Sequence, residues 1–164
     1  MSISSSLIGE LRSESKSTRK ILERVPFEHR DWKPHEKSMT LARLATHIAQ
    51  LNRWVYTAIE HDEFVFQPSG NVIDIAASLP ELLGIFEDHL AKALYALENC
   101  PEEDFEKTWT VKRGDRVIYQ PTKKLAIRQW GFNHTYHHRG QLTVFLRLLN
   151  VPVPGMYGPT ADER

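Results

Sequence analysis

The chain has 164 residues, of which 41% are hydrophobic and 26% are charged, a composition typical of a globular protein and not of a disordered or membrane chain. We therefore expect a single domain over residues 1–164 with one core. Basic and acidic side chains both total 21, so no net positive field favours binding to nucleic acid or to anionic lipid, and neither partner is predicted.

The start of the chain gives no sign of export. The stretch MSISSSLIGELRSESK lacks both the basic start and the apolar run of a signal peptide. No stretch approaches the ~20 apolar residues of a membrane span. We therefore expect a cytoplasmic protein. Cys100, the single cysteine, cannot form an intrachain disulfide, and we interpret it as a small side chain at a helix end and not as a nucleophile.

Two amphipathic helices are predicted in the first part of the chain. Apolar residues recur at helical spacing from about residue 5 to 25, where Pro26 stops the helix. The next segment has no period, so we interpret it as a connection that ends at an N-cap, either Ser38 or Thr40. A second helix is then expected over residues 41–60.

A third helix and a short hairpin are predicted next. After a loop at residues 61–71, leucines repeat with the helical period over residues 79–97, and Pro80 suits the first turn of that helix. The period changes in residues 107–120, where strand-favouring side chains flank the turn sequence of residues 113–115. This segment predicts a short hairpin or an ordered loop.

The fourth helix is expected over residues 122–150, because Pro152 and Pro154 forbid its continuation. Four long amphipathic segments with little strand predict an all-α fold, an antiparallel four-helix bundle. The hairpin or ordered loop precedes the last helix.

Two histidines of the fourth helix occupy positions where a bundle normally holds leucine. His134 and His138 fall within about 20° of the centre of the apolar stripe on this helix. The stripe is formed by Ile127, Leu142, Phe145 and Leu149. His137 is rotated by about 80° from that centre, so we interpret it as a flanking residue, either one that supports the metal ligands or one at the surface. Four other histidines lie in loops or on charged faces, where a solvated imidazole is expected: His29, His35, His61 and His89.

The spacing of His134 and His138 favours metal binding. Residues at i and i+4 place their rings on one helix face, about 6 Å apart along the axis. Burying two ionisable rings side by side costs free energy unless both find partners, and one divalent cation satisfies both. The alternative, a pair of core histidines hydrogen-bonded to polar groups, stays open. A third ligand is expected from a facing helix, and His47, at the edge of the apolar stripe of the second helix, is the candidate.

Two motifs resemble the DinB/YfiT-like family of metal-dependent proteins. They are SMTLARLATHIAQLNRW and HTYHHRGQLTVFLRLLNVPVPGMYGPTADE. The resemblance implies that His47, His134 and His138 are the metal ligands and that His137 is not. It also implies a bundle of up-down-down-up connectivity that is often a homodimer, with a nickel or zinc ion and, in some members, a low-molecular-weight thiol as cofactor.

Three neutral nitrogen ligands leave a coordination position open, which is typical of a catalytic metal site. The leading hypothesis is a metal-dependent enzyme, thiol-dependent transferase-like or hydrolase-like, that acts on a small-molecule substrate. The alternatives are a non-catalytic metal-binding or stress-related bundle protein and a metal-free interaction bundle. Arg139, Gln141 and Tyr157 are candidates for anion binding or orientation, although Arg139 points sideways on the wheel and equally fits a surface or dimer-interface position.

Overall fold

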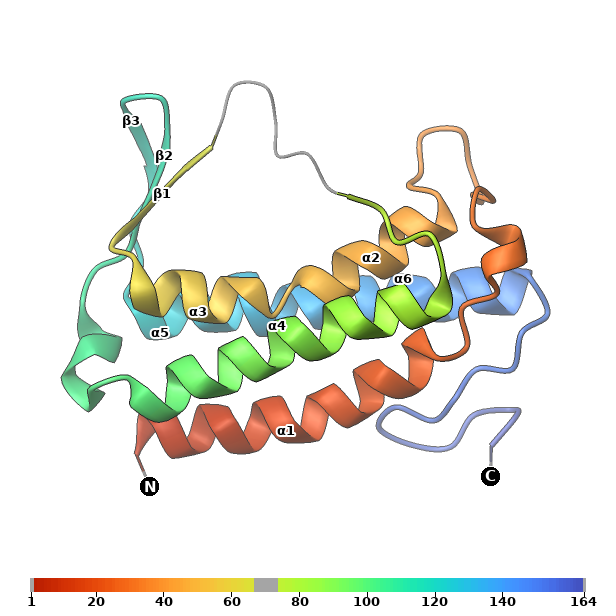
Figure 1. Ribbon diagram of the computed structural model, residues 1–164, viewed down its shortest axis with the longest axis horizontal. Coiled ribbons are helices and arrows are strands. Elements are labelled where there is room, and N and C mark those ends of the chain that lie inside the picture. The colour runs from red at the N-terminus through yellow and green to blue at the C-terminus, as the bar shows by residue number, and fades with distance from the viewer. Residues whose placement is uncertain (1, 67–73, 164) are drawn as a thin grey trace.

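The computed structural model describes residues 2–66 and 74–163. Four helical segments pack side by side along the long axis of the molecule (Figure 1). They are α1 (Ile3–Leu22), α2 (Leu41–Gln50) followed by α3 (Arg53–Glu60), α4 (Leu79–Asn99), and α5 (Lys123–Ala126), which leads through η3 (Ile127–Asn133) into α6 (His134–Leu148). Two short 3-10 turns, η1 (Phe27–His29) and η2 (Glu102–Glu106), lie in the connections.

The helical segments follow the up-down-down-up order that the resemblance implies. In Figure 1, α1 and the α5–α6 segment run one way, whereas α2–α3 and α4 run the opposite way. The helical part of the predicted fold is therefore confirmed. None of the helices in the described ranges is long and apolar enough to cross a membrane.

A small sheet stands at one end of the bundle, so the fold is not purely helical. Strands β2 (Thr110–Arg113) and β3 (Arg116–Tyr119) form the predicted hairpin, and Gly114, with a φ of 58°, makes its turn. Strand β1 (Glu63–Phe66) pairs parallel to β2. The prediction of a loop for residues 61–71 is therefore wrong for β1, while residues 67–71 lie outside the described ranges.

The second predicted helix, residues 41–60, is divided in two. Thr40 caps α2, because its side chain accepts a hydrogen bond from the Arg43 amide, so of the two predicted caps Thr40 is the one used. A turn at Leu51 and Asn52 then separates α2 from α3. The apolar period continues through the turn, and for this reason the sequence pattern does not reveal it.

The fourth segment is nearly continuous from Lys123 to Leu148, as predicted, but its middle is a π-helix. The wider π turn brings Gly131 against α3, where an added Cβ would lie 3.2 Å from Val55 Cγ2. Glycine therefore allows the close approach of η3 to α3. Asn150, with a φ of 58°, ends the segment, while the amide of Val151 donates to the Leu146 carbonyl.

Two apolar clusters fill the bundle. One gathers buried residues from the ends of the helices near the C-terminal tail, including Leu44, Ile48, Phe86, Leu142 and Leu146. The other lies near the sheet and includes Leu51, Trp54, Trp109, Ile127 and Phe132. Along α2 and α6 the three predicted metal ligands fall between members of these clusters, so packed side chains on both sides hold the histidine-bearing turns in place.

Candidate metal centre

The structure brings together the three histidines predicted from the sequence. His47 projects from α2, and His134 and His138 project from the first two turns of α6. The Nε2 atoms of His47 and His134 are 3.3 Å apart, and one nitrogen of each ring lies within 4.8 Å of the others. His47 and His134 are half-buried, while His138 keeps 9% of its surface exposed. His137 is exposed and does not belong to this group.

These three nitrogens fit a divalent cation. Two ligands at ~2.0–2.1 Å from a tetrahedral metal are about 3.3–3.4 Å apart, which matches the His47–His134 separation. The wider separations, up to 4.8 Å, exceed this value, so the rings would have to rotate about their side-chain bonds when a metal binds. Neutral imidazoles suit zinc, nickel, copper and iron alike. The cluster can therefore hold one metal ion.

The π-helical segment positions His134. It ends at Asn133, one residue before the first ligand on α6. Widened π turns alter the hydrogen-bond pattern of the backbone and are frequent beside functional sites. The backbone of Trp130, within this segment, acts on the His134 ring in the direction that raises its pKa, against the larger effect of burial.

Gln141 orients His138. Its Oε1 lies 2.7 Å from His138 Nδ1, and its amide nitrogen lies 3.1 Å from His137 Nε2. Because a carbonyl oxygen only accepts, His138 Nδ1 carries the proton and Nε2 keeps its lone pair for a metal. His137, an exposed flanking residue, thus contacts the site through Gln141 as a relay, so both alternatives predicted for it apply.

Replacing Gln141 with leucine is expected to weaken metal binding by roughly 10–100-fold, the usual cost of losing such an orienting partner. Gln141→Glu keeps the acceptor and should retain most of the affinity. Competition with a chromophoric chelator measures the difference, and His137→Ala is the control for the other end of the relay. Unchanged affinity in Gln141→Leu would show that His138 is oriented by other contacts.

All three histidines favour the neutral form. Burial, followed by the positive charges of the neighbouring histidines and Arg53, lowers the pKa of His47 from 6.5 to about 4. Burial and His138 likewise lower the pKa of His134 to about 4. Burial is also the main cause of the lowered pKa of His138. Neutral imidazole is the form that ligates metal, so the cluster is ready to bind at neutral pH.

The same shifts predict how metal binding depends on pH. Because the pKa of His47 and of His134 is about 4, protons compete weakly at pH 6, where a free histidine with a pKa of 6.5 is mostly protonated. Metal occupancy should therefore persist from pH 7 to pH 6 and fall as the pH approaches 4. Equilibrium dialysis over this range measures it. Loss of most of the metal between pH 7 and pH 6 would contradict the shifts.

The position predicted for Arg139 is wrong. Its side chain is 2% exposed inside the monomer and lies neither on the surface nor in the metal cluster. The guanidinium donates to the Glu14 carboxylate at 2.6 Å, to Thr18 Oγ1 at 3.1 Å and to the Tyr157 hydroxyl. Arg139 therefore joins α6 to α1 and to the C-terminal tail. The Tyr157 hydroxyl also donates to the Glu14 carboxylate, at 2.9 Å.

The remaining histidines and the cysteine lie outside the cluster. His29, His35 and His61 are exposed, as predicted. His89 is instead half-buried, with its Nδ1 2.9 Å from the Tyr56 hydroxyl. Cys100, half-buried, is the C-cap residue of α4, as its place before a proline predicts.

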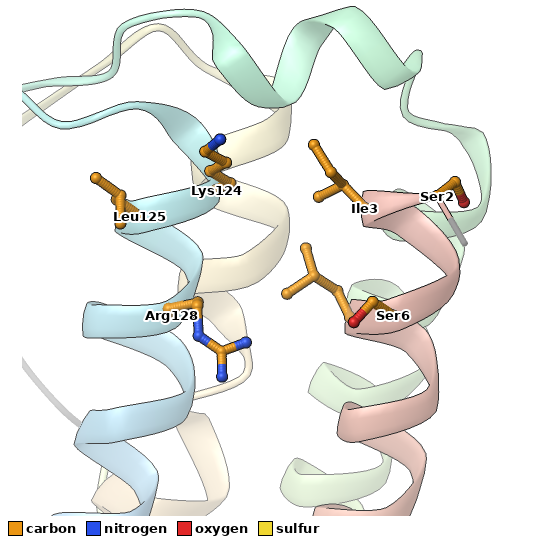
Figure 2. A pocket seen from close by; sticks show the side chains of 7 residues that line it. Ser2, Ile3, Ser6, Lys124, Leu125 and Arg128 are labelled. Atoms are coloured by element: carbon orange, nitrogen blue, oxygen red, sulfur yellow. The ribbon is translucent and has the colours of Figure 1, made fainter.

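Two surface pockets differ in their relation to the histidines. One, of about 360 Å³, is lined by Phe66, Gln129, Trp130 and the metal ligand His134. The other lies between the start of α1 and α5 and is lined by residues that include Lys124 and Arg128 (Figure 2). Its two cations pair with Glu106 and Glu10. Only the first of these pockets gives a small molecule access to a metal ligand.

Comparison with known proteins agrees with this geometry. The sequence model of the DinB family matches residues 1–164. The chain belongs to the DinB family. Among curated proteins, the uncharacterized protein YrdA of Bacillus subtilis (strain 168) is 23% identical over 153 residues, which cover 92% of this chain and 85% of that protein.

Two solved structures share the fold. The DinB-like protein YjoA from Bacillus subtilis superposes with a TM-score of 0.70 at 20% identity, covering 97% of this chain and 99% of that one. A DinB-like protein from Bacillus cereus ATCC 10987 gives a TM-score of 0.68 at 23% identity, covering 91% and 94%. At this level of identity the likeness establishes the DinB fold and leaves the reaction to be inferred from the site.

Proposed function

We propose that this protein is a metal-dependent enzyme that joins a nucleophile, water or a low-molecular-weight thiol, to a small electrophilic substrate. The observation that carries the proposal is the group of three neutral imidazoles from α2 and α6, with nitrogens within 4.8 Å of one another. A structural zinc site normally has four protein ligands, whereas a catalytic site has three and one open position. Among the described residues, no fourth ligand completes this cluster.

The residues around the cluster fit this role. His47, His134 and His138 would hold a nickel or zinc ion, which acts as a Lewis acid and lowers the pKa of a bound water or thiol. Gln141 keeps the His138 ring in the ligating orientation. Trp130 and Phe66 line the pocket beside His134. An apolar part of a substrate would pack against their rings and exclude water.

The proposal is tested by turnover. Protein loaded with nickel or with zinc, and protein stripped by a chelator, are mixed with a panel of thiols and small electrophiles, and product is followed by mass spectrometry. We expect product only with metal and none with His134→Ala. Metal binding without any metal-dependent product, with water or with thiols, would instead support a non-catalytic metal-binding bundle.

A further inference from the structure

Arg53, the first residue of α3, differs from the other basic side chains. Among the described residues, it is the one half-buried cation with no carboxylate within 4.0 Å. The segment of residues 67–73 contains no Asp or Glu that could pair with it. The other described cations without such a partner are exposed: Lys16, Lys20, Lys33, Lys37, Arg43, Arg113 and Arg116.

An unpaired guanidinium at this depth costs free energy. Exposed cations are stabilised by water, but a half-buried one has lost part of that solvation and normally gains an anionic partner in return. Burial lowers the pKa of Arg53, which reflects the same cost. Buried arginines elsewhere in the chain follow the rule, since Arg139 is paired with Glu14. Arg53 therefore lacks the anionic partner that a half-buried guanidinium normally has.

Arg53 is not one of the residues that line the pocket at the metal centre, but aromatic contacts connect it to that pocket. Its Cζ atom lies 5.0 Å from the centroid of the Trp54 ring. Trp54 packs edge-on against Trp130, with centroids 4.8 Å apart, and Trp130 lines the pocket together with His134. Arg53 is therefore connected through two tryptophan rings to the pocket that His134 lines.

A second polar group lies between Arg53 and the ligands along the chain. Gln50 is three residues after His47 and three before Arg53, and its Oε1 is buried with no hydrogen-bond partner. A buried polar atom without a partner costs free energy comparable to a lost hydrogen bond. The α2–α3 segment therefore carries a metal ligand, an unsatisfied amide and an unpaired cation at successive three-residue intervals.

We propose that Arg53 binds the carboxylate of the substrate, which makes the substrate of the proposed metal-dependent reaction a small organic acid. This inference rests on the proposed function and adds the substrate class. A guanidinium matches a planar carboxylate with two parallel hydrogen bonds. One arginine balances one negative charge, which suits a carboxylate better than a doubly charged phosphate ester. The aromatic rings of Trp130 and Phe66 would contact the apolar part of the acid.

The test is calorimetric titration of the metal-loaded full chain with benzoate and with its neutral analogue benzamide. We expect wild type to prefer benzoate by roughly tenfold or more, the usual contribution of a hydrogen-bonded charge pair. Arg53→Gln should abolish the preference without changing benzamide affinity or metal content. Arg53→Lys keeps the positive charge but cannot form two parallel hydrogen bonds with a carboxylate, so it should retain part of the preference for benzoate.

Arg43→Gln is the matched control, because Arg43 is exposed on α2 and its charge also acts on His47. This variant should bind benzoate as wild type does. Equal losses in the Arg43 and Arg53 variants, or no preference for benzoate in wild type, would overturn the inference. The two proposals can fail separately. Loss of benzoate binding in Arg53→Gln supports the carboxylate site even if no turnover is found. Turnover by wild type, together with unchanged benzoate affinity in Arg53→Gln, overturns the carboxylate site alone.

Discussion

Replacing His47 with alanine is expected to weaken metal binding by more than 100-fold while the bundle remains folded. Loss of an orienting partner such as Gln141 typically costs 10–100-fold, and loss of a direct ligand should cost more. His47 is also the one ligand supplied by α2, so the variant leaves only the two rings of α6. Chelator competition measures the affinity, and circular dichroism checks the fold.

His89→Ala is the matched control for this variant. His89 is likewise a half-buried histidine with a lowered pKa, but its partner is the Tyr56 hydroxyl and it lies outside the cluster. We expect its metal affinity to equal that of wild type. A His47→Ala protein that binds metal as tightly as the His89→Ala protein would show that His47 is not a ligand.

Replacing Arg139 with methionine is expected to lower the free energy of unfolding by about 3–5 kcal/mol, the usual cost of removing one member of a buried ion pair. Glu14 would lose its cation, while Thr18 and Tyr157 would lose a hydrogen-bond partner. The tail that carries Tyr157 would lose one of its contacts with α6, while the ion pair between Arg147 and Asp162 would remain. Urea denaturation followed by circular dichroism measures the change.

Arg12→Met provides the comparison, because Arg12 pairs with Glu98 at the surface, where both side chains are largely exposed. Surface pairs contribute about 0–1 kcal/mol, so this variant should unfold close to wild type. Similar midpoints for the Arg139 and Arg12 variants would mean that Arg139 does not stabilise the bundle through its buried contacts.

Helical periodicity predicted the four helical segments and selected His134 and His138, because both residues belong to α6 and keep a spacing of 100° per residue. It did not predict the π turns before His134, which change the phase between Ile127 and the ligands. A local pattern contains no sign of such a turn, and the close packing of Gly131 on Val55 that accompanies it involves another helix.

The features that were missed depend on contacts between distant segments. On the helical wheel of α6, Arg139 points to the side of the apolar stripe, which suggests an exposed position. Its burial is explained by its contacts with Glu14 and with the C-terminal tail. Strand β1 pairs with β2, some 47 residues later in the chain, from Glu63 with Thr110 onward. His47 was assigned as a ligand more from the family resemblance than from its position on the helical wheel. Convergence of the three rings is the part of the site that required the fold.

The most direct test of the metal centre is elemental analysis of untagged protein, purified without chelator and compared with His138→Ala. We predict about one divalent ion per chain in wild type, and a large loss of bound metal in the variant. From the family resemblance, we expect this ion to be nickel or zinc. Wild-type protein without stoichiometric metal that also fails to take up added nickel or zinc would contradict the three-histidine site.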